Sequence, residues 1–113
     1  MAYGPDGQWL ASADDNGEVI LWDATAENEV SLARRIHAHR DFVNCVRFSP
    51  DGRRLATASR DGTVKVWDAG TGGLRRLLHT RQQQVYAVAY HPEGKLLASA
   101  GTDGTVKIWE APQ

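Results

Sequence analysis

Residues 50–68 read PDGRRLATASRDGTVKVWD, and the chain contains this 19-residue segment in three versions. The other two are residues 5–23, PDGQWLASADDNGEVILWD, and residues 92–110, PEGKLLASAGTDGTVKIWE. Without gaps, the first two copies are identical at 10 positions and the last two at 11. Self-similarity at spacings of 45 and then 42 residues indicates a repeat architecture, so one unit used three times determines the fold.

Each unit is predicted to contain four short antiparallel strands. In the middle unit, β-branched and aromatic residues or polar-apolar alternation mark four segments, which are residues 42–49, 54–59, 63–68 and 74–79. Pro-Asp-Gly at residues 50–52 and Asp-Gly at residues 61–62 are turn signals, because proline presets its own φ and glycine accepts a positive one. The pattern therefore favours hairpins and an all-β fold.

A tryptophan followed by an acidic residue closes each repeated segment, at Trp22-Asp23, Trp67-Asp68 and Trp109-Glu110. With the Gly-x-Val strand and the Pro-acidic-Gly turn before it, this pattern resembles the WD40 repeat, whose period of about 40 to 45 residues the chain shares. The resemblance implies an all-β fold of WD40-type β-propeller blades, each a four-stranded antiparallel sheet. It predicts about three blades, at residues 1–36, 37–78 and 79–113, the first truncated at its start and the last without its outer strand.

The resemblance also implies a hydrogen-bonded structural tetrad inside each blade, made of His, Ser or Thr, Asp and Trp. In the middle repeat the positions are filled by His39, by Thr57 or Ser59, by Asp61 and by Trp67. The chemistry is sound, because buried indole and imidazole N–H groups need acceptors and a carboxylate and a hydroxyl supply them.

The outer repeats depart from this tetrad. The third repeat keeps Ser99, Asp103 and Trp109, but counting back from the repeat proline places Arg81 where the histidine is expected. The first repeat has Asn16 in the Asp position. We therefore expect an incomplete tetrad in the third blade and a weak one in the first.

His, Asp and a hydroxyl also compose catalytic triads, so the tetrad has a second interpretation. A triad needs an exposed nucleophile beside an oxyanion hole, whereas the repeat explains these residues as internal struts. No Cys pair or acidic ligand stands at metal-binding spacing from His37, His39, His79 or His91, and Cys45 is interpreted as a small buried strand residue. We expect a non-enzymatic protein with no catalytic residue, no metal and no cofactor.

Propellers of this family bind partners mainly on one face, formed by the loops between blades and the tight turns. The resemblance places on this face Asp14, Asp15, Asn16, Arg40, Asp41, Phe42, Arg60, Arg81, Gln82, Gln83, Gln84 and Thr102. An aromatic ring and arginines on a rigid rim are typical anchors of protein recognition, so Phe42 and Arg60 are the main binding candidates. Arg40, Asp15, Arg81, Gln84 and Thr102 follow them. The alternative is that Phe42 only covers its own blade.

Composition narrows the kind of partner. The chain has 13 Lys plus Arg and 14 Asp plus Glu, a formal net charge of -1, so charge gives no reason to expect nucleic acid or an anionic membrane surface. No apolar run approaches the roughly 20 residues of a membrane span. One cysteine cannot form an internal disulfide, which favours a reducing compartment and a cytoplasmic protein. The expected partner is a protein or peptide.

Three blades leave a propeller ring incomplete, because rings of four to eight blades are typical. Either further blades of a longer chain complete the ring, or copies of the chain assemble, with a six-bladed dimer favoured over a nine-bladed trimer. The function expected from the resemblance is a scaffold for protein or peptide binding. Two alternatives stay open: a regulatory or sensor module of a larger multidomain ATPase or kinase, and a purely structural self-assembling repeat, natural or engineered.

Overall fold

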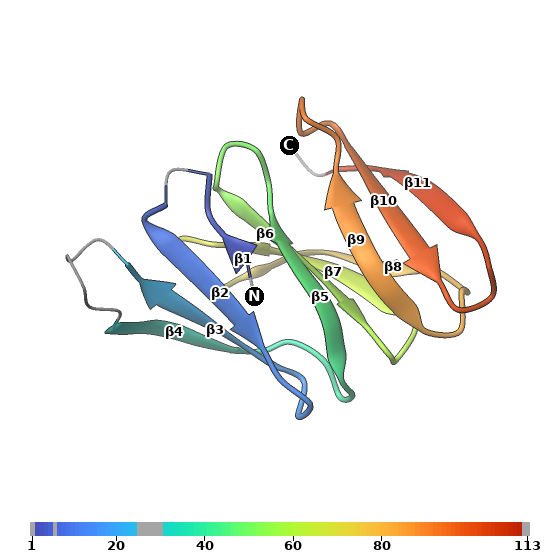
Figure 1. Cartoon of the computed structure of the whole chain (residues 1–113), viewed down its shortest axis with the longest axis horizontal. Helices are drawn as coiled ribbons and strands as arrows, with labels where there is room; N and C mark the ends of the chain where they lie inside the picture. Colours follow the sequence, from blue (N-terminus) through green and yellow to red (C-terminus); the bar gives the residue numbers. More distant parts are fainter. Residues whose placement is uncertain (1, 6, 25–30, 112–113) are drawn as a thin grey trace.

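The computed structural model describes residues 2–5, 7–24 and 31–111. Within these ranges the chain forms only strands and turns, so no described helix is long and apolar enough to cross a membrane. Three antiparallel sheets stand side by side, coloured blue, green to yellow, and orange to red along the chain (Figure 1). The predicted all-β class and the three-blade arrangement are confirmed, and the three sheets do not close a ring.

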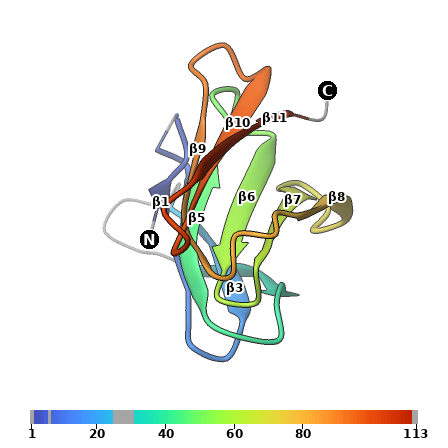
Figure 2. The same cartoon turned by 90° about the vertical axis from the view of Figure 1, so that its right-hand side faces the viewer.

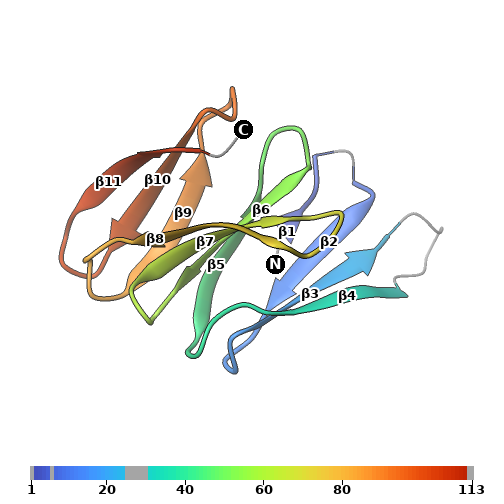
Figure 3. The same ribbon diagram turned by 180° about the vertical axis from the view of Figure 1, so that it is seen from behind.

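The first sheet has the strand order β1-β2-β3-β4, with the bounds Ala2–Tyr3, Trp9–Ala13, Glu18–Asp23 and Ser31–His37. The second has the order β5-β6-β7-β8, with the bounds Val43–Phe48, Arg54–Ser59, Thr63–Asp68 and Leu74–His79. The third has the order β9-β10-β11, with the bounds Val85–Tyr90, Leu96–Gly101 and Val106–Glu110. Seen from behind, β11 is the strand at the far edge of the third sheet (Figure 3).

Aligned residues of the repeats occupy equivalent places in their sheets. Thr57 lies opposite Lys65 in the second sheet, as Ser99 lies opposite Lys107 in the third. The middle sheet has its four strands where the alternation predicted them, except that β5 is one residue shorter at each end. The division into blades at 1–36, 37–78 and 79–113 stays a prediction about domain boundaries.

The tight turn between the second and third strands of a sheet is where the next blade docks. Gly17 in the first sheet has a φ of 82°, and its carbonyl accepts hydrogen bonds from the backbone N–H groups of Ala38 and His39 at 2.9 and 3.0 Å. A Cβ on Gly17 would lie 1.9 Å from the His39 carbonyl oxygen. Glycine is therefore required here for two reasons, the left-handed backbone and the close approach of the next loop.

Two apolar clusters join the three sheets. The cluster between the first and second sheets contains Ala11, Val19, Leu21, Ile36, Ala38, Val43, Val46, Leu55 and Trp67. The cluster between the second and third contains Ala56, Ala58, Val64, Val66, Leu78, Val85, Val88, Leu97 and Ala111. Cys45 packs against the second cluster and is only partly buried, with its Sγ 3.7 Å from the Val88 carbonyl oxygen. Removal of these faces from water is the main force that holds blade to blade.

Polar side chains add a second, repeated link between neighbouring sheets. Lys65 donates to the Ala38 carbonyl at 2.7 Å, and the aligned Lys107 donates to the Thr80 carbonyl. At the outer rim, Arg34 of β4 donates to the Gly70 carbonyl at 3.1 Å, and Arg76 of β8 donates to the Glu110 carbonyl at 2.9 Å. The two arginine bonds satisfy backbone carbonyls of the next sheet, and the two lysine bonds satisfy carbonyls of the loop that leads from the preceding sheet into the lysine's own sheet.

Candidate functional site

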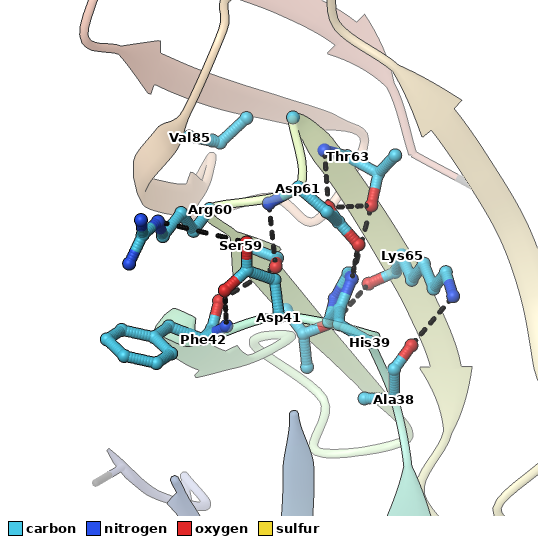
Figure 4. Close-up of polar contacts among 12 residues, drawn as sticks. Ala38, His39, Asp41, Phe42, Ser59, Arg60, Asp61, Thr63, Lys65 and Val85 are labelled. Atoms are coloured by element: carbon cyan, nitrogen blue, oxygen red, sulfur yellow. Dashed lines mark hydrogen bonds and ion pairs between the residues drawn. The ribbon is translucent and has the colours of Figure 1, made fainter. Parts of the chain in front are cut away.

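The tetrad of the second blade is a continuous chain of hydrogen bonds, and Figure 4 shows its members His39 and Asp61 beside the segment that carries Asp41 and Phe42. The Trp67 indole N–H donates to the Thr57 hydroxyl at 3.1 Å, and that hydroxyl lies 2.8 Å from His39 Nε2. His39 Nδ1 lies 3.0 Å from the Asp61 carboxylate. Since a carboxylate only accepts, Nδ1 carries the proton and Nε2 accepts from Thr57, so all donors along the chain point the same way.

Of the two hydroxyls that the sequence offered for this tetrad, Thr57 is the one that contacts both rings. Ser59 makes different contacts, since it donates to the Phe42 carbonyl at 2.7 Å and accepts the Asp61 N–H at 3.1 Å. Ser59 therefore ties the loop before β5 to the turn between β6 and β7. This one side chain therefore fixes the backbone of both segments that carry the main binding candidates, the loop with Phe42 and the turn with Arg60.

Protonation in the tetrad follows from burial and hydrogen bonding. Burial lowers the pKa of His39 below its ordinary value of 6.5, although the hydrogen bond to Asp61 and its charge oppose the shift. Burial alone would raise the pKa of Asp61, but hydrogen bonds from Thr63 and His39 outweigh it and hold the pKa below 3.8. At neutral pH the cluster therefore holds a neutral imidazole and a charged carboxylate.

The same cluster lacks what a catalytic triad requires. The His39 side chain is fully buried, and both of its ring nitrogens have partners. The Thr57 hydroxyl is buried between the two rings, so no substrate carbonyl could reach it. Across residues 2–5, 7–24 and 31–111, no group of three or more His, Cys, Asp or Glu side chains is placed to hold a metal ion.

In the third blade, Gln82 takes the position that the sequence alignment gave to Arg81. Gln82 is fully buried, and its Oε1 accepts from the Ser99 hydroxyl at 2.6 Å, which in turn accepts from the Trp109 indole at 3.0 Å. Its Nε2 donates to the carbonyl and the hydroxyl of Thr105 at 2.9 and 3.0 Å. The expectation that Gln82 lies on the exposed face is therefore wrong, because this amide serves as the third blade's substitute for the histidine.

Asp103 contributes to this blade only through the turn. Its Oδ1 accepts from the backbone N–H and the hydroxyl of Thr105, which lowers the pKa of the carboxyl. In the first blade, the Trp22 indole donates to the Ser12 hydroxyl at 3.0 Å, while Asp14 accepts the N–H of Asn16. Asn16 itself is exposed. In all three blades the Trp indole thus donates to a Ser or Thr hydroxyl. The blades differ in the side chain that this hydroxyl contacts next, which is His39 in the second blade and Gln82 in the third.

Phe42 and Arg60 lie together on the surface above the second blade's tetrad. The Arg60 guanidinium stacks over the Phe42 ring, 5.0 Å from its centroid, and its Nε is 3.8 Å from the Asp41 carboxylate. The Phe42 ring is 39% exposed, although its backbone is fixed by bonds from Ser59 and Arg60 to its carbonyl. Figure 4 shows the ring and the guanidinium pointing away from the buried tetrad.

The remaining candidates of this face are exposed residues of the loops and turns. They are Asp15, Arg40, Arg81, Gln84 and Thr102. Gln84 and Thr102 contact each other, since the Thr102 N–H donates to the Gln84 carbonyl at 2.9 Å and the Thr102 hydroxyl accepts the Gln84 N–H at 3.3 Å. Arg81 has a φ of 59°, a left-handed conformation that turns the chain into the buried Gln82. Whether these residues bind a partner stays a prediction.

At the other end of the strands from Phe42, a cavity of about 200 Å³ lies between the turns that follow β5 and β9. Its walls include Ser49, Asp51, Arg53 and Tyr90. The Tyr90 hydroxyl is buried and makes no hydrogen bond within the described residues. Burial raises the pKa of Tyr90 to about 12, so the phenol stays neutral. The cavity is formed by equivalent turns of the second and third sheets.

Comparison with known proteins identifies the repeat. The sequence profile of the WD40 family, described as WD domain, G-beta repeat, matches residues 1–23, 30–68 and 74–110. No curated protein matches the chain. The matched segments cover most of the chain, and each of the last two spans the outer strand of one sheet and three strands of the next, β4 to β7 and β8 to β11. WD40 domains are generally non-catalytic scaffolds for protein–protein interactions, and by these three matches the chain belongs to the WD40 family.

Proposed function

We propose that this chain binds a protein or peptide through an exposed patch made of Arg40, Asp41, Phe42 and Arg60, the Phe42–Arg60 patch. The observation that supports this most is the exposed ring of Phe42 stacked with Arg60, on a backbone whose carbonyl accepts hydrogen bonds from the Ser59 hydroxyl and the Arg60 N–H. Groups already held in place lose little conformational freedom when a partner binds, so their contacts convert efficiently into affinity.

The chemistry of the patch defines the partner. The Phe42 ring offers an apolar surface, and Arg60 keeps exposed donors because the distance to Asp41 is 3.8 Å, longer than a direct hydrogen bond. A peptide with an apolar side chain next to a carboxylate would fill both roles. Such a carboxylate would displace Asp41 as the partner of Arg60, while the apolar side chain covers the ring.

The test compares a double variant with a matched control. Phe42→Ala with Arg60→Ala is expected to lose the proteins captured by the wild-type chain, whereas Leu32→Ala with Arg75→Ala removes an exposed aliphatic and an arginine from the outer strands and is expected to retain them. Capture followed by mass spectrometry measures the difference. An unchanged set of captured proteins in the Phe42/Arg60 double variant would show that the patch is not the binding site.

We also propose that the ring is completed by self-association, with two copies giving six blades. The support is that the open face of the third sheet repeats the covered face of the second: Ala98, Ala100, Val106 and Ile108 align with the buried Ala56, Ala58, Val64 and Val66. The first sheet of another copy offers Leu10 and Trp22, which align with the buried Leu55 and Trp67. A head-to-tail contact of this kind closes into a ring when the rotation per blade fits.

Light scattering of the purified chain over a range of concentrations tests this second proposal. The expected result is a discrete mass twice that of the chain. A trimer would contradict the six-bladed ring and support a nine-bladed one, and a monomer at every concentration would assign completion of the ring to other polypeptide segments.

A further inference from the structure

Asn16 and Gly17 form the only Asn-Gly pair in the sequence, and they lie in the tight turn between β2 and β3. The aligned turns of the other two sheets carry Asp-Gly, at residues 61–62 and 103–104. A backbone nitrogen attacks the side-chain amide of the preceding asparagine most readily when it belongs to glycine, because no side chain hinders the approach. This turn is therefore the place where the chain can react with itself.

The Asn16 side chain is exposed, and Asp14 makes the contact that the aligned aspartates make in the other turns. In the second and third sheets, the aspartate at this position accepts the backbone N–H two residues later, at 2.9 and 3.0 Å. In the first sheet Asp14 accepts that N–H, from Glu18 at 3.0 Å, and also the N–H of Asn16 at 2.9 Å. Asp103 is exposed as well, although the loop before β9 is in place. The amide carbon of Asn16 is thus open to attack.

The attacking nitrogen belongs to Gly17, and its hydrogen bond is the longest of the three aligned ones. The Gly17 N–H donates to the Asp14 carbonyl at 3.4 Å, whereas the bonds of the aligned Gly62 and Gly104 are 3.2 and 3.1 Å long. To reach the amide carbon of Asn16, this nitrogen must turn out of that bond with the rest of its peptide unit. The weak bond makes the first step of that movement easy.

The contact of the turn with the second blade opposes the same movement. The Gly17 carbonyl accepts from the backbone N–H groups of Ala38 and His39, and the Asp14 carbonyl accepts the Val43 N–H at 3.3 Å. Figure 2 shows the turn between β2 and β3 and the loop between β4 and β5 together at the lower end of the molecule. Rotation of the peptide unit pulls the Gly17 carbonyl away from this loop, so the turn reacts when the two sheets separate locally.

We propose that Asn16 is a site of intramolecular deamidation whose rate is controlled by the docking of the second sheet onto the first. The Gly17 nitrogen forms a bond to Cγ of Asn16, the bond from Cγ to Nδ2 breaks, and ammonia leaves with the proton of the Gly17 N–H. Water then opens the resulting succinimide at either of its two carbonyls, which gives aspartate or isoaspartate at residue 16. One water enters and one ammonia leaves, so the reaction needs no oxidant or reductant.

The two products differ in their effect on the fold. Aspartate leaves the backbone unaltered and gives the turn the Asp-Gly sequence of the other two sheets. Isoaspartate directs the backbone through the side chain and adds a methylene group before Gly17, which displaces the carbonyl from the N–H groups of Ala38 and His39. The site therefore converts a reversible opening between the first two sheets into a permanent one.

Mass spectrometry of the full chain, aged at mildly alkaline pH, tests the reaction. We expect a mass increase of about 1 Da, located at residue 16 by fragmentation and accompanied by release of ammonia. Asn44 is an internal control that should not change, because it precedes Cys45 and its amide donates to the Val85 carbonyl at 3.0 Å. Asn16→Gln is the matched variant and should lose the mass increase, since its longer side chain closes a less favourable ring.

A synthetic peptide with the sequence of residues 11–21, ASADDNGEVIL, gives the rate of the same reaction without the fold. We expect the folded chain to deamidate roughly tenfold or more slowly than the peptide, because the docked turn must open first. The chain unfolded in urea should react at the rate of the peptide.

Amide hydrogen exchange measures the effect of the products on docking. The amides of Ala38 and His39 should exchange faster in the isoaspartate fraction of the aged chain than in the fresh chain. The Asn16→Asp variant supplies the other product with a normal backbone, and its exchange at these two amides should match that of the fresh chain.

Three results would overturn the proposal. The first is an unchanged mass at residue 16 in the folded chain after the peptide has reacted completely. The second is an equal rate in the folded chain and the peptide, which would show that docking does not control the reaction. The third is unchanged exchange at Ala38 and His39 in the isoaspartate fraction. None of these readouts depends on the Phe42–Arg60 patch, so each proposal can fail without the other.

Discussion

His39 shows how one buried side chain can make a blade sensitive to pH. Its imidazole is neutral in the folded chain because burial lowers its pKa below 6.5, and it bridges the Thr57 hydroxyl and the Asp61 carboxylate in that state. Protonation would leave Nε2 as a second donor facing a hydroxyl that already accepts from Trp67. The hydroxyl would then have to donate elsewhere, and the nearest acceptor is the Lys65 carbonyl at 3.4 Å.

This predicts a loss of stability below neutral pH. Because the folded pKa is lower than the unfolded one, the unfolded chain binds the proton first, so the free energy of unfolding falls as the pH drops below 6.5 and levels off under the folded pKa. Urea unfolding between pH 7.5 and pH 4.5 should show this slope, and His39→Gln should remove it. The lowered pKa of Asp61 acts in a separate window, below 3.8. An identical slope in both proteins would assign the effect to other groups.

Tyr90 is expected to be a residue where the native side chain costs stability. Its hydroxyl is buried and has no hydrogen bond to any residue that the structure describes, so Tyr90→Phe removes a polar group that lost its contact with water on folding. We expect the free energy of unfolding to rise by about 1 kcal/mol. Tyr86→Phe, at a ring that is 53% exposed, is the control and should change it by less than about 0.5 kcal/mol. A clear loss of stability in Tyr90→Phe would show that the hydroxyl has a partner in solution.

At the scale of the element, the tight turns are the parts of the repeat that tolerate least change. Gly17 and Gly104 are aligned and have φ values of 82° and 83°, but a Cβ on Gly17 would meet the His39 carbonyl at 1.9 Å while a Cβ on Gly104 would meet nothing within 4 Å. The same substitution at the two sites therefore separates backbone strain from collision with the next blade.

Gly104→Ala should cost about 1–2 kcal/mol in unfolding free energy, the ordinary cost of a left-handed alanine. Gly17→Ala should cost more, because the loop at His39 must also move, and it should weaken the contact between the first and second sheets. Thermal unfolding of both variants measures the difference. Equal costs would show that the loop yields freely and that docking of the blades does not depend on this contact.

The strands could be predicted from the sequence because hairpins of fixed length keep the repeat in register from its proline to its tryptophan. The resemblance to the WD40 repeat assigned the tetrad of the second sheet to His39, Asp61 and Trp67, but it did not separate Thr57 from Ser59. Gln82 was missed because the loops before β5 and β9, residues 38–42 and 80–84, are equal in length but follow different paths. Arg81 and Gln83 have positive φ values of 59° and 65°, so the side chain that enters the blade stands one position later than a gapless count gives. Loops absorb such changes at little cost, so their residues cannot be placed by counting from a strand.

At the scale of the whole molecule, the two clusters leave the middle sheet covered on both faces and the outer sheets on one. The open ring and the exposed face of the third sheet followed from counting repeats against the four to eight blades that propellers use. What covers that face does not follow from the count. It depends on the residues of the sheet that packs there, and the residues of the second sheet that cover the first, such as Val46, Leu55 and Trp67, are the closest description of them that the chain itself provides.

The arginine bonds between neighbouring sheets have a consequence for how the structure comes apart. Each of them connects a blade only to the blade beside it, so the array behaves like a short row of coupled units in which a disturbance travels one step at a time. Heat or a pulling force would detach an end before it loosened the centre. The third sheet, with three strands and one covered face, would fray first, and the second sheet would persist as the last ordered remnant of the chain.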